Sequence, residues 1–319
     1  MDRERGIRYF PIGLFASVMG FAGVTIAIRQ AENLYALNNV LSTIFLAITT
    51  LLFLLNGGIF LYRMFLHREE VKKDFNHPVK MNFFAAISLS MLLLAAAYFE
   101  LSKAMSLTLW IAGSIMQMSL TLVILSKLIW HHQFQIGQFN PSWFIPIVGN
   151  IVVPIAGTLL NMPKEINWMF FGFGALFSII YMTLFFNRSV FHPPLPAKLL
   201  PTYFILMAPP AIGFVSYIKI SESADTFAYI LYGIAFFIGL FLLFQVKRFM
   251  SIPFFVSWWA FLFPSAAMTI ATVQLYFESG HVVYRWFFTV QLIGLIGLVL
   301  YLAWKTIELA MKRSLCLKE

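Results

Sequence analysis

The residues that could carry acid–base, nucleophilic or redox chemistry all lie at the edges of long apolar stretches. The 13 Asp and Glu residues fall in connecting segments or within a turn or two of the end of such a stretch, and the six histidines do the same. An ionisable group buried at the middle of a membrane helix costs several kcal/mol and usually marks a functional site. Because no such group is present, the sequence predicts no catalytic residue, and we expect that the protein is not an enzyme.

Ligands for a metal or a haem are not expected inside the apolar stretches either. Haem iron in membrane subunits needs axial ligands, most often histidine, within the helices. His131 and His132 are adjacent in the sequence, but neighbouring residues on a helix point about 100° apart, so two solvated histidines are the better interpretation. We therefore predict no metal site and no cofactor. A subunit of a respiratory complex is disfavoured for the same reason.

The elements that must position the remaining polar residues are membrane helices. Of the 319 residues, 61% are hydrophobic and only 11% are charged, whereas soluble domains carry about 25% charged residues. Ten apolar stretches reach the ~20 residues that a helix needs to cross a membrane core. They lie at about 9–28, 37–62, 82–100, 104–130, 143–161, 166–187, 200–218, 225–246, 254–277 and 284–309. Residues 1–319 are therefore predicted to form a single all-α transmembrane domain.

Lys and Arg are unevenly distributed between the two sides of this predicted domain. Of the 22 basic residues, 17 fall on the side that carries both chain ends and 5 on the other, whereas Asp and Glu divide 7 against 6. This bias is the positive-inside pattern, and it predicts that both termini of this multi-pass protein are cytoplasmic. Topology and contact with anionic lipid account for the net charge of +9. Nucleic acid is not an expected partner.

The odd-numbered spans differ from the even-numbered ones in their prolines. Each odd span begins near a proline, and three odd spans contain further prolines that are predicted to kink them, namely Pro146, Pro154, Pro209, Pro210 and Pro264. An interior proline removes a backbone hydrogen bond, and the freed carbonyl needs protein or water around it. We therefore predict five helical hairpins whose odd helices form a quasi-five-fold inner ring around a central pore. Ordinary packing of membrane helices, in which prolines are common, is the alternative.

Small residues in the first and fifth spans are candidates for the wall of such a pore. These candidates are Ala16, Gly20, Gly149 and Gly157. Close packing between helices is the alternative interpretation for most of them. In the ninth span Phe263 precedes Pro264, so a bend there could direct a bulky ring into the pore. Hydrophobic constrictions of this kind gate channels by excluding water.

Two segments resemble a known family. FPIGLFASVMGFAG, residues 10–23, and SWWAFLFPSAAMTIAT, residues 257–272, resemble the corresponding segments of the family that includes bacterial tellurite-resistance proteins, plant slow anion channels and yeast malate transporters. The resemblance implies a homotrimer in the bacterial inner membrane, with a separate anion pore in each subunit that Phe263 plugs. It also implies an association with tellurite resistance. The chain departs from the family at Ala16, where the resemblance predicts glycine.

Taken together, the sequence predicts a gated passive channel for small anions. The membrane interior carries no fixed charge, and the Lys and Arg residues at the cytoplasmic rim would raise the local concentration of anions. A secondary transporter or exporter of dicarboxylates or oxyanions is the alternative. It is disfavoured because proton-coupled carriers usually place a carboxylate or histidine on their path. The expected partners are small inorganic anions and membrane lipid.

Overall fold

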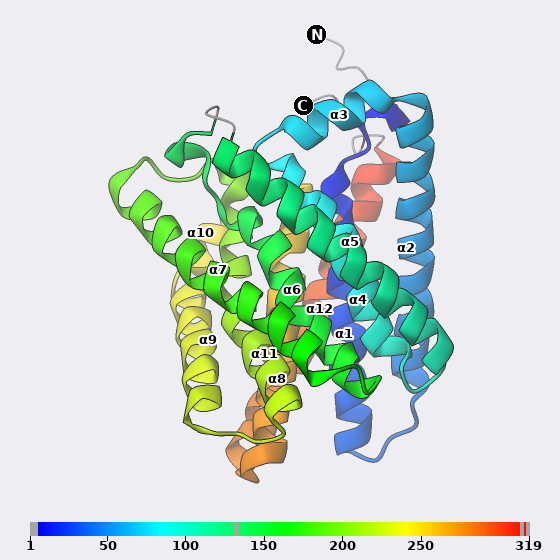
Figure 1. Cartoon of the computed structure of the whole chain (residues 1–319), viewed down its shortest axis with the longest axis vertical. Helices are drawn as coiled ribbons and strands as arrows, with labels where there is room; N and C mark the ends of the chain where they lie inside the picture. Colours follow the sequence, from blue (N-terminus) through cyan, green and yellow to red (C-terminus); the bar gives the residue numbers. More distant parts are fainter. Residues whose placement is uncertain (1–5, 131–133, 313–315, 317–319) are drawn as a thin grey trace.

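The computed structural model describes residues 6–130, 134–312 and 316. These residues contain ten helical segments that are long and apolar enough to cross a membrane (Figure 1). Their bounds are Ile12–Leu34, Val40–Leu66, Lys80–Tyr98, Lys103–Trp130, Pro141–Leu159, Lys164–Phe191, Ala197–Ser221, Thr226–Phe244, Val256–Ser279 and Val282–Met311. The predicted all-α class and number of spans are therefore confirmed. The histidine pair, His131 and His132, lies outside the described residues.

Burial alternates from one span to the next. In the odd spans 72–89% of the most apolar stretch is buried inside the protein, against 22–33% in the even spans. The α-helices of the odd, inner spans are α1 (Phe15–Leu34), α4 (Ala85–Tyr98), α6 (Ile145–Leu159), α8 (Ala208–Ser221) and α11 (Leu262–Ser279). The outer helices are α2 (Val40–Leu66), α5 (Lys103–Trp130), α7 (Lys164–Phe191), α9 (Thr226–Phe244) and α12 (Val282–Met311). The predicted division into inner odd helices and outer even helices is confirmed.

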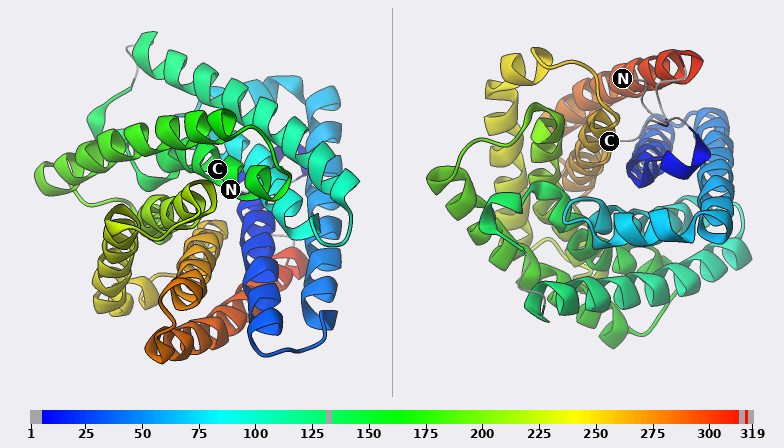
Figure 2. Two further views of the ribbon diagram at one scale, coloured as in Figure 1. Left: turned by 60° about the horizontal axis from the view of Figure 1, so that its bottom comes forward. Right: turned by 90° about the horizontal axis from the view of Figure 1, so that it is seen from above.

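The five inner helices form a closed ring. In chain order α1, α4, α6, α8 and α11 each pack against the next, and α11 packs back against α1. Each outer helix lies against its own inner partner and also against the following inner helix, as α2 does with α1 and α4. Viewed along the bundle, the outer helices therefore surround the inner ring (Figure 2). The predicted quasi-five-fold arrangement of five hairpins is confirmed.

Every inner span begins as a 3₁₀-helix and continues as an α-helix. The preceding 3₁₀ segments are Ile12–Leu14, Lys80–Phe84, Pro141–Phe144, Ala197–Met207 and Val256–Phe261. A 3₁₀-helix has three residues per turn rather than 3.6, so the side chains change direction where the helix type changes. The five changes of helix type lie at equivalent places in the five hairpins. They form a structural repeat within the chain.

The five prolines that are predicted to kink the odd spans occupy two kinds of position. Pro146 lies in the first turn of α6, and Pro209 and Pro210 lie in the first turn of α8. These three prolines still lie inside continuous helical spans, because a 3₁₀ segment runs directly into α6 and another into α8. Pro264 is the third residue of α11, again directly after the change of helix type. Only Pro154 lies in the interior of its α-helix, as predicted.

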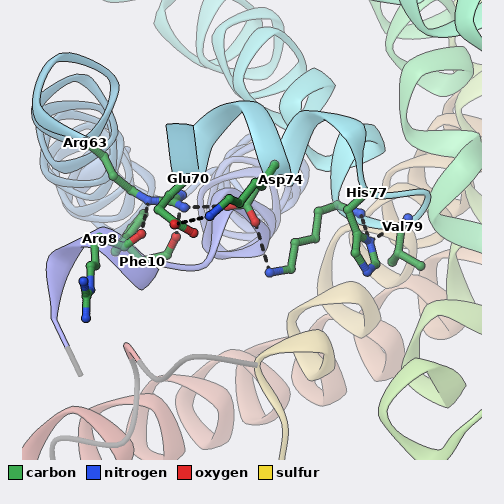
Figure 3. A network of polar contacts seen from close by, with 9 residues as sticks. Arg8, Phe10, Arg63, Glu70, Asp74, His77 and Val79 are labelled. Carbon is green, nitrogen blue, oxygen red and sulfur yellow. Dashed lines mark hydrogen bonds and ion pairs between the residues drawn. The ribbon is translucent and has the colours of Figure 1, made fainter. Parts of the chain in front are cut away.

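A buried arginine fixes the end of the bundle at which the chain begins. Arg63, near the end of α2, donates Nε to the Arg8 carbonyl at 2.6 Å, Nη1 to the Phe10 carbonyl at 2.9 Å and Nη2 to Asp74 Oδ2 at 2.6 Å (Figure 3). Asp74 belongs to the short helix α3 (Arg68–Asn76), which lies across this end of the bundle (Figure 1). The Gly6 N–H donates to the Cys316 carbonyl at 3.2 Å. We call this end, where the first and last described residues meet, the terminal end.

Replacing Arg63 by Ala is expected to destabilise the protein by about 3–5 kcal/mol, because it leaves a buried carboxylate and two carbonyls without their main donor. Thermal unfolding of the purified protein in detergent measures this effect. Arg68→Ala is the matched control, since Arg68 is exposed at the start of α3 and its loss is expected to change stability by less than about 0.5 kcal/mol. Equal melting temperatures for the two variants would contradict a structural role of the Arg63 network.

Candidate functional site: the axis of the inner ring

A narrow cavity lies on the axis of the ring, beside the changes of helix type. All five inner spans contribute to its wall, which consists of Ala16, Met19, Phe83, Leu89, Ile145, Val148, Ile205, Ala208, Trp259, Ala260, Phe263 and Pro264. Every one of these side chains is apolar. The cavity has a volume of about 20 Å³, close to the minimum of about 10–15 Å³ that one water molecule requires.

A wide cavity continues along the axis toward the end opposite the termini, which we call the far end. Its volume is about 160 Å³, and all five inner spans line it again. Near the ring's middle its wall is apolar, with residues such as Gly23, Ile212 and Val215. Toward the far end the wall becomes polar and includes Arg29, Gln30, Glu100, Lys219 and Gln274. The space along the axis is thus narrow and apolar in one half of the ring, and wide with a polar mouth in the other half.

Among the residues that the structure describes, Phe263 alone lines both cavities. It is the second residue of α11 and is 96% buried. Its ring lies beside Gly23 of α1, where an added Cβ would come within 3.7 Å of the ring carbon Cδ2. The neighbouring Phe261 packs elsewhere, with its ring 4.6 Å from that of Phe204 and 5.4 Å from that of Trp258. Of the two rings, only that of Phe263 stands between the cavities.

Two cationic side chains with different partners lie at the mouth of the wide cavity. Arg29 Nη1 forms an ion pair with Glu100 Oε2 at 2.9 Å, and Arg29 Nε donates to Ser42 Oγ at 2.9 Å. Lys219, in the last turn of α8, is half-buried and forms no hydrogen bond or ion pair with any described residue. Its ammonium group is therefore the cationic group of this wall that no carboxylate neutralises by direct contact.

The structure separates the four predicted pore-wall residues into two groups. Ala16 lines the narrow cavity. By contrast, a Cβ on Gly20 would lie 2.9 Å from Cβ of Leu262, and one on Gly149 would overlap the Gln117 side chain. A Cβ on Gly157 would likewise overlap the Asn167 side chain. The prediction for Gly20, Gly149 and Gly157 is therefore corrected, because these glycines permit close contact between helices, which was the alternative interpretation.

Buried polar side chains within the spans mostly join helices to one another. Gln117 of α5 donates Nε2 to the Pro146 carbonyl at 2.7 Å and accepts a hydrogen bond from Ser88 Oγ at 2.7 Å. Asn150 donates to Thr121 Oγ1 at 3.0 Å. Satisfying buried polar groups in this way is required where no water is present. These groups stabilise the wall of the ring and do not line either cavity.

Sequence reasoning did not identify Lys219 or Arg29 as site residues. Both lie near helix ends, where basic residues are expected for reasons of topology alone. The signal that could have found Lys219 is its spacing from Ile212 and Val215, which places all three on one face of α8. In the described part of the chain no group of three or more His, Cys, Asp or Glu side chains clusters as metal ligands would.

Comparison with known proteins assigns this architecture to a family of channels and transporters. The profile of the SLAC1 family, described as voltage-dependent anion channels, matches residues 9–307. An uncharacterised transporter of Methanocaldococcus jannaschii is 28% identical over 92% of this chain and 89% of its own length. The tellurite resistance protein TehA homolog of Haemophilus influenzae is 24% identical over 91% of this chain and 89% of its own length. The S-type anion channel SLAH2 of Arabidopsis thaliana is 27% identical over 83% of this chain and 52% of its own length.

Replacing Gly20 by Ala is expected to destabilise the protein by about 1–3 kcal/mol, because the added methyl group would overlap the Leu262 side chain. The melting temperature in detergent measures this effect. Gly297→Ala is the control: this glycine of α12 has open space around it, and alanine there is expected to be neutral or stabilising by up to about 1 kcal/mol. An unchanged melting temperature for Gly20→Ala would favour a place for Gly20 in the pore wall.

Proposed function

Because the chain belongs to the SLAC1 family of voltage-dependent anion channels, we propose that this protein is a gated passive channel for small anions. The observation that carries the proposal is the pair of cavities on the axis of the ring, each lined by all five inner spans. A conduit enclosed by one subunit needs such a wall. The relatives named as anion channels supply the class of solute.

We propose that Phe263 is the gate. Its ring is shared by the two cavities, and the narrow cavity beside it has room for about one water molecule. An ion that entered this apolar space would lose most of its hydration without gaining a polar partner, which costs several kcal/mol or more. Apolar constrictions stop ions in this way without closing sterically. A rotation of the ring away from Gly23 would join the two cavities.

We propose that selection among anions follows the cost of removing their water. Among the described residues, no charged side chain lines the narrow cavity, so no charged group at the constriction offsets the cost of dehydration. Weakly hydrated anions such as iodide and nitrate would therefore pass more readily than fluoride or sulfate. Ala16 would form part of this wall, where its methyl group narrows the bore.

We further propose that the terminal end is cytoplasmic, as the distribution of Lys and Arg indicates, and that three subunits assemble in a bacterial inner membrane. The outer helices support a membrane location because they expose large apolar side chains such as Leu54, Ile179 and Phe237. Such surfaces face lipid or a neighbouring subunit.

Replacing Phe263 by Ala is expected to raise the anion current by more than about tenfold, a change equivalent to at least ~1.4 kcal/mol in the barrier to permeation. Voltage-clamp recording of the reconstituted protein measures the current. Phe261→Ala is the matched control, because it removes an adjacent buried ring that does not line the wide cavity. A Phe263→Ala variant that conducts no better than the parent, or a current that saturates and follows a proton gradient, would contradict a passive channel gated by Phe263.

Reversal potentials of the Phe263→Ala variant are expected to give relative permeabilities in the order iodide and nitrate, then chloride, then fluoride. The physical reason is the increasing free energy of hydration along this series, which an uncharged wall cannot offset. Bi-ionic recordings with one anion on each side measure the order. The reverse order would indicate a site at the constriction that binds anions strongly.

A further inference from the structure

The mouth of the wide cavity carries a lysine whose position is suited to binding an anion. Lys219 follows Ile212 by seven residues on α8, so its Cα lies about 10 Å further toward the far end. All of Ile212, Val215 and Lys219 line the wide cavity. The wall is therefore apolar near Phe263 and ends in an ammonium group.

Lys219 also lies where the wide cavity adjoins the surface. A second hollow at the far end, open to the outside, is lined by Thr158, Asn161, Asn167 and Lys219 among other residues. Lys219 and Leu159 are common to this hollow and to the wide cavity. A solute that moves between the surface and the axis along this route passes the ammonium group.

The carboxylates near Lys219 have other partners, and Glu222, which lines the same surface hollow, pairs with Lys164 at 3.3 Å. Glu100, on the same wall, is already paired with Arg29 at 2.9 Å. Glu278 is exposed and attracts Lys219 electrostatically from outside the cavity lining, and its Oε1 accepts a hydrogen bond from Gln274 at 2.8 Å. The charged groups of the wall, Arg29, Glu100 and Lys219, therefore sum to a net charge of +1, which Lys219 contributes.

We propose that Lys219 is the core of a binding site for a small monovalent inorganic anion at the far-end mouth of the pore. The side-chain amides of Gln30 and Gln274 line the same cavity and offer further N–H groups. The volume of about 160 Å³ leaves room for an anion that keeps part of its hydration shell. This site rests on the proposed function for its role, which is to concentrate anions beside the Phe263 constriction.

A snorkelling lysine at a helix end would explain part of this arrangement, since long basic side chains often extend from a membrane helix toward water. That explanation requires only contact with the surface. It does not account for a lysine that also lines the axial cavity, on the same helix face as two residues deeper along the axis. The two interpretations differ in what they predict for ion flow.

The first test uses unitary currents in the conducting Phe263→Ala background at low ionic strength, where charges act over about 30 Å. Lys219→Gln is expected to lower the current of anions that enter from the far end by about two- to tenfold, whereas Lys219→Arg preserves it. Glu100→Gln is expected to raise the same current, because it leaves Arg29 without its carboxylate. Lys103→Gln is the control for charge outside the cavity, since Lys103 is exposed at the far end and lines neither cavity.

The outcome is informative in either direction. Equal currents in Lys219→Gln and its background, or an equal loss in Lys103→Gln, would overturn the site. If the Phe263→Ala variant carries no current, the proposed function is contradicted. The anion-binding site is then tested by a second measurement, which does not depend on conduction.

The second measurement is binding of bromide alone, located by its anomalous scattering in crystals of the parent protein. A peak beside Lys219 that persists in Lys103→Gln and disappears in Lys219→Met supports the site, whether or not the protein conducts. The absence of a peak in the parent, or a peak that remains in Lys219→Met, would overturn it. The two experiments thus separate failure of the site from failure of the channel.

Discussion

Close contact between α1 and α11 at Gly20 and Gly23 closes the ring on which the rest of the molecule depends. The other four contacts of the ring join consecutive hairpins, whereas this one joins the first inner helix to the last. A Cβ on Gly20 would lie 2.9 Å from Leu262 Cβ, and one on Gly23 would lie 2.8 Å from Ala266 Cβ. Without side chains at these positions, α11 can lie against α1 and place Phe263 on the axis. The close packing of α1 against α11 therefore also determines where the ring of Phe263 lies.

The change from 3₁₀ to α at the start of each inner span is the second constraint. It occurs five times at equivalent places, and in three spans a proline follows within the first turn of the α-helix. Proline fits there because its fixed φ suits a helix. The narrow cavity lies beside these changes because the side chains turn at the same depth in all five spans. The position of Phe263 just before Pro264 is one instance of this repeat.

The sequence predicted the large-scale architecture well because membrane topology depends on properties that are additive along the chain. Span length, basic residues and the alternation of proline-containing with plain spans sufficed to predict ten helices, five hairpins and an inner ring.

The assignments of Gly20, Gly149 and Gly157 to the pore wall were wrong because a small residue suits both a pore wall and a close helix contact. Only the rotation of each helix about its own axis distinguishes the two. The sequence did not predict that Pro146, Pro209 and Pro210 follow the ends of 3₁₀ segments, because a pattern of apolar residues does not reveal where a 3₁₀ turn ends. Lys219 was overlooked because the packing of α8 against α6 and α11 determines which face of α8 meets the axis.

The electrostatics of the axis follow from what the membrane tolerates. A fixed charge at the constriction would require a compensating partner, because an unpaired ion in an apolar environment is costly. Such a charge would also bind the permeating ion and slow its release, whereas conduction requires binding that is weak enough for the ion to leave. Placing charge at the mouth avoids both problems, because Arg29, Glu100 and Lys219 lie where the cavity is wide enough to hold water. In the proposed channel, attraction at the mouth raises the local concentration of anions, and the apolar ring of Phe263 is the proposed gate.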